Sequence, residues 1–114
     1  MSVDLFAEIC VSDFERAREW YSRLLGSEPS FIPHETEAVW ELAEHRFVFI
    51  LEDAERAGNA THMVMVGDLD ALVAEIGGRG LEPAERETYS NGVRKAIYRD
   101  ADGNGVGYGG APAR

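Results

Sequence analysis

In the stretch "VDLFAEICVSDFERAREWYSRLLG", residues 3–26, the spacing of apolar residues changes once, and this change indicates the fold. Every second residue is apolar at first, which is the period of a β-strand, at Val3, Leu5, Ala7, Ile9 and Val11. The spacing then becomes that of a helix, with an apolar stripe at Phe14, Ala17, Tyr21, Leu24 and Leu25. Ser12 or Asp13 can cap the helix, and Gly26 is a natural stop. The stretch predicts a strand followed directly by a helix.

The same order returns in the second half of the chain. "THMVMV" at 61–66 predicts a strand, and Asp68 can cap a second helix 55 residues after Asp13. Three shorter strands are expected after each helix, at 30–34, 38–42 and 46–52, and at 81–87, 93–99 and 105–108. We therefore predict an α+β fold of two βαβββ units, 1–52 and 61–110, with a polar linker at 53–60 in a single domain, 1–114.

Charge and cysteine content limit the function. The 114 residues carry a net charge of -10 with a pI near 4.6, which disfavours nucleic acids and anionic membranes and favours a cationic ligand. No apolar run approaches the ~18 residues of a membrane span. Cys10 is the only cysteine, so no internal disulfide can form, and a cytoplasmic location is expected.

The stretch "YRDADGNGVGYGG", residues 98–110, has three alternative interpretations. A calcium loop starting at Asp100 needs a glutamate at its twelfth position, which is Ala111. A nucleotide-binding glycine motif needs a helix after it, and no helix pattern follows Gly110. Asp-Gly and Asn-Gly are also typical hairpin turns. We predict a turn between two strands.

The stretches "AEICVSDFERAREWYSRLLG", "HMVMVGDLDALVAEI" and "YRDADGNGVGYGG" resemble the vicinal oxygen chelate superfamily. This group includes glyoxalase I, extradiol dioxygenases, fosfomycin resistance enzymes and bleomycin resistance proteins. The resemblance implies that the two units form one curved mixed sheet around a cleft. It also implies metal ligands, usually His or Glu, on four strands. The matching positions here are Phe6, Ile50, His62 and Gly107, and only His62 offers a donor atom.

The resemblance therefore implies a member without a metal or other cofactor, as in the bleomycin resistance proteins, which hold a drug in the cleft. The predicted ligand-binding residues are Phe6, Glu8, Cys10, Trp40, Ile50, His62, Tyr98 and Tyr108. In the strand at 61–66 we expect Met63 and Met65 to face the helix and His62 to face the cleft. Glu8 has two open alternatives, a ligand contact or an ion pair with an arginine such as Arg94.

Three function classes follow. The leading one is a protein that binds a small organic molecule, cationic or aromatic, without chemistry. The second is a lyase, isomerase or dioxygenase that uses a regrouped metal site of Glu8, Glu52 and His62, or metal-free acid–base catalysis by Glu8 and His62. The third is a non-catalytic partner subunit. We also predict a homodimer that uses the first strand and the first helix beside Trp20.

Overall fold

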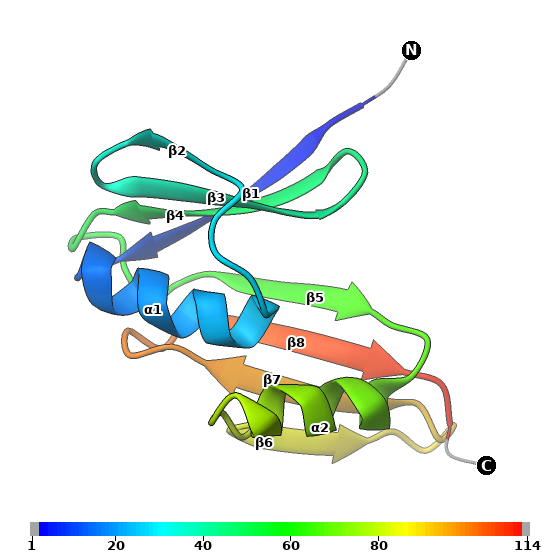
Figure 1. Ribbon diagram of the computed structural model, residues 1–114. Coiled ribbons are helices and arrows are strands. Elements are labelled where there is room, and N and C mark those ends of the chain that lie inside the picture. Colours follow the sequence, from blue (N-terminus) through cyan, green and yellow to red (C-terminus); the bar gives the residue numbers. More distant parts are fainter. Residues whose placement is uncertain (1–2, 113–114) are drawn as a thin grey trace.

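The computed structural model describes residues 3–112 and contains two helices and eight strands (Figure 1). In chain order these are β1 (Leu5–Val11), α1 (Phe14–Leu25), β2 (Phe31–His34), β3 (Glu37–Ala43), β4 (Arg46–Glu52), β5 (Thr61–Met65), α2 (Leu69–Gly78), β6 (Glu85–Thr88), β7 (Arg94–Arg99) and β8 (Gly105–Gly110). The predicted α+β class and the two βαβββ units are confirmed. None of the helices within 3–112 is long and apolar enough to cross a membrane.

The strands form two four-stranded mixed sheets. The first has the order β1-β4-β3-β2 and the second has the order β5-β8-β7-β6. In each sheet the first strand of the unit pairs in parallel with the last one, and the remaining pairs are antiparallel. The strands β1 and β5 lie at the inner edges of their sheets, and no strand ladder joins them in the part of the chain described.

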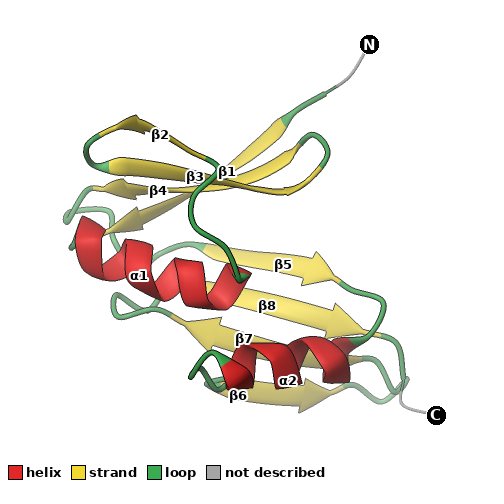
Figure 2. Ribbon diagram, viewed as in Figure 1, coloured by secondary structure: helices red, strands yellow, loops and turns green. Residues whose placement is uncertain are grey.

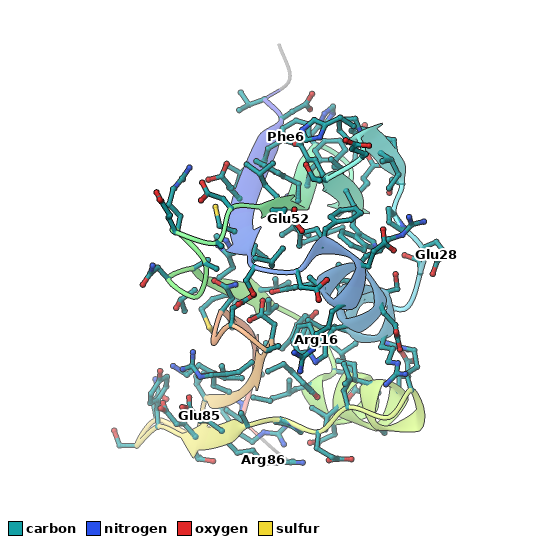
Figure 3. All side chains as sticks on the ribbon, turned by 90° about the vertical axis from the view of Figure 1, so that its left-hand side faces the viewer. Phe6, Arg16, Glu28, Glu52, Glu85 and Arg86 are labelled. Carbon is teal, nitrogen blue, oxygen red and sulfur yellow. The ribbon has the colours of Figure 1, made fainter. Side chains whose placement is uncertain are left out.

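Both helices lie on the same side of the two sheets (Figures 2 and 3). Helix α1 begins because Asp13 Oδ1 accepts a hydrogen bond from the amide of Arg16 at 3.2 Å, and it ends at Gly26, whose φ of 77° is left-handed. Asp68 caps α2 in the same way, with the amide of Ala71 at 3.0 Å. The sequence allowed either Ser12 or Asp13 as the capping residue of α1, and the structure shows that it is Asp13.

One hydrophobic core extends under both helices and joins the two units. From the first unit it takes Ile9 and Val11 of β1 and the apolar stripe of α1. From the second unit it takes Ile76 of α2 and one face of β7 and β8. Because the helices cover one face of each sheet, the opposite face of each sheet carries no helix (Figure 2).

The loop between β7 and β8 is the predicted turn, and it also joins the units. Asp100 accepts from the amides of Asp102 and Asn104, and its Oδ2 accepts from the hydroxyl of Tyr21 at 2.8 Å. Asn104 donates to the carbonyl of Cys10 at 2.9 Å, and Asp102 accepts from the amide and hydroxyl of Ser12. The polar residues that resemble a calcium loop are thus occupied by protein donors, several of them from the first unit.

Candidate functional site

The candidate site is the open face of the first sheet, which consists of Phe6, Glu8, Cys10, Phe47, Phe49 and Leu51. The parallel register of β1 with β4 determines this set. Glu8 lies opposite Phe49, whereas Ile9 lies opposite Ile50, and Ile9 belongs to the core under α1. Side chains alternate across a strand, so the residues that alternate with Ile9 and Ile50 point away from the helices.

The open face of the first sheet has an aromatic wall. The rings of Phe6 and Phe47 stack with their centroids 4.4 Å apart and an interplanar angle of 6°. Phe49 meets Phe6 edge-on, with centroids 6.5 Å apart. Phe6 is 46% exposed, and Phe31 of the neighbouring β2 is equally exposed. Such a wall can take a planar or apolar molecule.

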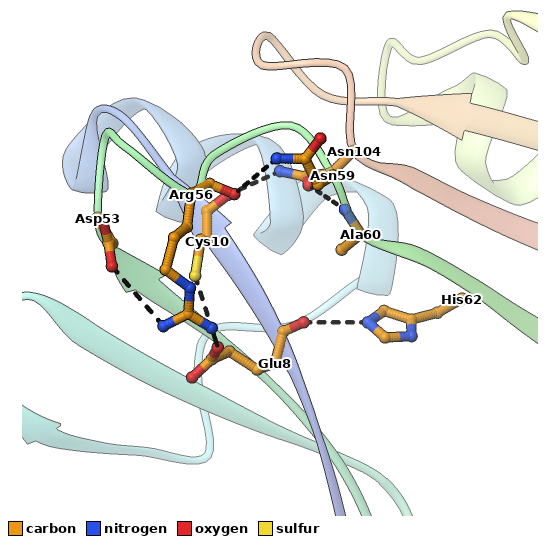
Figure 4. Close-up of polar contacts among 8 residues, drawn as sticks. All are labelled: Glu8, Cys10, Asp53, Arg56, Asn59, Ala60, His62 and Asn104. Carbon is orange, nitrogen blue, oxygen red and sulfur yellow. Dashed lines mark hydrogen bonds and ion pairs between the residues drawn. The ribbon is translucent and has the colours of Figure 1, made fainter.

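Glu8 places one carboxylate beside this wall (Figure 4). Its Oε1 accepts from Arg56 Nη2 at 2.6 Å and from the thiol of Cys10 at 3.6 Å. Arg56 comes from the linker between the units and also lies 3.7 Å from Asp53. The sequence named Arg94 as a partner for Glu8, and that pairing is wrong, because Arg94 binds Asp70 at 2.7 Å. Burial, with a smaller contribution from the Glu8 charge, raises the pKa of Cys10, which keeps its thiol protonated.

His62 lies on the other side of β1 from the Glu8 carboxylate. Its Nε2 is 3.1 Å from the backbone carbonyl oxygen of Glu8, while the carboxylate points toward Arg56 (Figure 4). In β5, Val64 packs against the core and Met63 and Met65 are exposed, so the expected orientation of this strand is reversed. His62 therefore joins the two sheets at β1 and does not face the same space as the Glu8 carboxylate.

Four other predicted site residues lie in the core beneath the helices. Ile50 is fully buried there, and Trp40 is buried beside Tyr21 and donates from Nε1 to the carbonyl of Ser27. Tyr98 and Tyr108 are buried as a T-shaped pair with centroids 6.0 Å apart. The expectation that Ile50 and His62 share one cavity with Phe6, Glu8 and Cys10 is therefore wrong. On β4, the residues that point to the open face are Phe47, Phe49 and Leu51, whereas the sequence analysis had placed Ile50 there.

A regrouped metal site is not formed either. Glu52 lies opposite Val11 in the strand ladder and points to the helix side of the sheet. There its Oε1 accepts a hydrogen bond from the amide of Phe14 at 3.0 Å, at the start of α1. Phe6 and Gly107 carry no donor side chain. Within residues 3–112, no three His, Cys, Asp or Glu side chains are grouped closely enough to hold a metal ion. The residues present therefore do not fit the metal that the superfamily enzymes hold.

A polar groove of about 510 Å³ lies elsewhere, between α1 and the loop after β7. Its lining includes Arg16, Trp20, Arg23 and Arg99, together with Asp100 and Asp102 of the loop. Several of its charged side chains already have partners in the protein. Arg23 binds Glu19 at 2.7 Å, Arg99 binds Glu85 at 3.2 Å, and Asp102 accepts a hydrogen bond from the hydroxyl of Ser12. We assign this groove to the contact between the units.

Solved structures identify the family. A "glyoxalase / bleomycin resistance protein" from Catenulispora acidiphila DSM 44928 is 50% identical over 97% of this chain and all of its own, with a TM-score of 0.93. TnmS3, an antibiotic binding protein from Streptomyces sp. CB03234, shares 21% identity over 99% of this chain and 98% of its own, with a TM-score of 0.71. The fosfomycin resistance protein FosX from Listeria monocytogenes shares 14% over 97% and 94%, with a TM-score of 0.70.

No protein-family model and no curated protein matches the sequence. The two distant structures support the fold alone. The protein from Catenulispora acidiphila, by contrast, matches 97% of this chain at 50% sequence identity and has the same fold. This chain therefore belongs to the glyoxalase/bleomycin resistance family of the vicinal oxygen chelate superfamily.

Proposed function

We propose that this protein binds a small organic molecule on the open face of the first sheet and performs no metal chemistry there. The proposal rests on one observation. The stacked rings of Phe6 and Phe47 form an aromatic wall, and the partly exposed carboxylate of Glu8 lies beside it. Ligand sites are typically apolar with a few polar groups that fix orientation. A net charge of -10 favours a cationic or neutral ligand over an anion.

Sequestration of a drug is the specific form of this proposal. One relative with the same fold is described as an antibiotic binding protein, and another as a fosfomycin resistance protein. Acid–base catalysis by Glu8 and His62 has less support, because the His62 ring meets the backbone of Glu8 and not its carboxylate. The reduced thiol of Cys10 is compatible with the cytoplasmic location proposed from the sequence.

We further propose that a second copy of the chain packs beside this face in a homodimer and leaves the Glu8 site accessible. Phe6 of β1 and Phe31 of β2 are each 46% exposed on this face. Neighbouring exposed apolar side chains of this size are typical of interaction surfaces. The first strand thus belongs to the proposed interface, whereas Trp20 of α1 lines the polar groove.

The experiment combines metal analysis with a ligand screen. The purified protein is tested for stoichiometric divalent ions, and its melting temperature is measured against a panel of aromatic cations, neutral aromatics and antibiotics. We expect no stoichiometric metal and a rise in melting temperature with some ligands. Glu8→Gln should reduce that rise, and Glu75→Gln, which removes one equal charge from exposed α2, should keep it. A stoichiometric metal, or a response that Glu8→Gln leaves intact, contradicts the proposal.

A further inference from the structure

The ion pair between Glu8 and Arg56 occupies the one charged position of the proposed site. Arg56 Nη2 lies 2.6 Å from Glu8 Oε1, so a guanidinium already sits against the carboxylate of the site. The other carboxylate oxygen, Oε2, makes no hydrogen bond within residues 3–112. The site therefore contains a cation that the chain itself supplies, and the acceptor beside it is free.

Arg56 is weakly held in this position. It lies in the turn-rich linker outside any helix or strand, and its side chain is 62% exposed, against 34% for Glu8. Besides Glu8, its guanidinium forms an ion pair only with Asp53 in the described chain, at 3.7 Å. Exposed ion pairs of this kind contribute little, because water screens them and ordering both side chains costs entropy. A competing cation can therefore replace Arg56 without disturbing the fold.

Glu8, by contrast, is fixed. It lies in the middle of β1, between the buried Cys10 and the stacked ring of Phe6, and the strand is held by its parallel ladder with β4. Glu37 and Glu41 of β3 lie opposite Leu51 and Phe47 in the same sheet, and so add negative charge near the wall. A fixed carboxylate with an aromatic surface beside it favours a planar cation, through charge-assisted hydrogen bonds and cation–π contact.

We propose that Arg56 is an internal stand-in for the ligand, and that the ligand is a planar aromatic cation of the amidinium or guanidinium class that displaces Arg56 from Glu8. This inference rests on the proposed function and adds the class of the ligand and the residue that competes with it. The linker between the two units then sets the affinity of the site, since each bound cation must first release the side chain of Arg56.

The test uses benzamidine as the cationic probe, benzyl alcohol as the neutral probe and benzoate as the anion, with dissociation constants measured by calorimetry or NMR titration. Arg56→Gln removes the competitor and should tighten benzamidine about two- to fivefold. Arg99→Gln is the matched control, because it makes the same change of net charge at the Arg99–Glu85 pair of the second sheet. It should leave benzamidine affinity unchanged.

Glu8→Gln should weaken benzamidine by about tenfold or more, and adding Arg56→Gln to it should have no further effect. Weaker or unchanged benzamidine binding in Arg56→Gln overturns the stand-in role. If benzyl alcohol or benzoate binds the wild type as tightly as benzamidine does, the proposed function stands and the cationic class is wrong. If no probe binds either the wild type or Arg56→Gln, both the class and the proposed function fall.

Discussion

Glu8 and His62 meet across β1 through the backbone: the imidazole Nε2 lies 3.1 Å from the carbonyl oxygen of Glu8, while the Glu8 carboxylate faces Arg56. The two residues that the sequence marked as candidate acid and base thus serve different spaces. His62 fixes the contact between the inner edges of the two sheets. Glu8 supplies the charge on the open face of the first sheet.

Replacing these two residues should separate their roles. His62→Ala removes one partly buried hydrogen bond, and we expect the free energy of unfolding to fall by about 1 kcal/mol. Ligand affinity should change less than about twofold, since the ring does not reach the open face. Glu8→Gln should do the reverse, with weaker binding and little loss of stability. Urea denaturation and ligand titration of both variants check this, and a large loss of affinity in His62→Ala speaks against the assignment.

Asn104 should be among the most sensitive polar positions of the chain. It is fully buried, and its amide group donates to the Cys10 carbonyl and to Asp100 while accepting from the amide of Ala60, each at 2.9 Å. Asn104→Ala leaves several buried groups without partners, and should lower the free energy of unfolding by about 2–4 kcal/mol. Asn91→Ala, in an exposed hairpin, should cost less than about 1 kcal/mol. Equal effects in chemical denaturation would show that the loop does not join the units.

Gly58 tests the close approach of the linker to the same loop. Its φ is 92°, and an added Cβ would lie 2.4 Å from the backbone oxygen of Asp102, which cannot move aside as a side chain does. Gly58→Ala should therefore destabilise the fold by about 1–3 kcal/mol. Gly67→Ala is the control, because nothing lies within 4 Å of the added atom. A melting temperature of Gly58→Ala equal to that of the control would contradict this contact.

The buried tyrosines predict how stability depends on alkaline pH. Burial, with a smaller contribution from Tyr98, raises the pKa of Tyr108 to about 12, and burial beside Asp100 raises the pKa of Tyr21 as well. In the unfolded chain tyrosine ionises near ~10. The unfolded state therefore loses protons that the folded state keeps, and stability falls as the pH rises above about 10.

For Tyr108 this loss amounts to about 1 kcal/mol at pH 11. Urea denaturation at pH 9 and pH 11 should show a smaller loss of stability in Tyr108→Phe than in the wild type. Tyr89→Phe, at an exposed tyrosine, is the control and should behave as the wild type does. Identical pH dependence in Tyr108→Phe and wild type would rule out this contribution.

The fold was predictable because its signals are local and repeated. The apolar spacing changes from that of a strand to that of a helix at Asp13, and the same change occurs again at Asp68. These two changes mark the strand and helix that begin each βαβββ unit. The orientation of β5 was predicted wrongly, although the 55-residue offset between the two caps contains the information for it. That offset pairs Met63 with Glu8 and Met65 with Cys10, and so places the methionines on the open side. Matching His62 to a metal-ligand position by its distance from Asp68 shifted the strand by one residue, which exchanges its faces.

The site was harder to predict because it depends on contacts between distant segments. Ile50 and Phe49 are neighbours on a strand with apolar residues on both faces, so periodicity alone does not tell which of them faces the helix. The parallel register with β1 decides it. Arg56 lies in a linker with no periodicity, 48 residues from Glu8, and no local pattern marks it as the partner.

Ligand binding to the open face of the first sheet can be tested directly by NMR chemical-shift changes in the isotope-labelled protein. If the ligand binds the open face of the first sheet, titration with benzamidine should shift the ring signals of Phe6, Phe47 and Phe49. The indole signal of Trp20, in the polar groove beside α1, should stay unchanged. Shifts confined to Trp20 and Arg16, with the three phenylalanines unaffected, would contradict binding at this face.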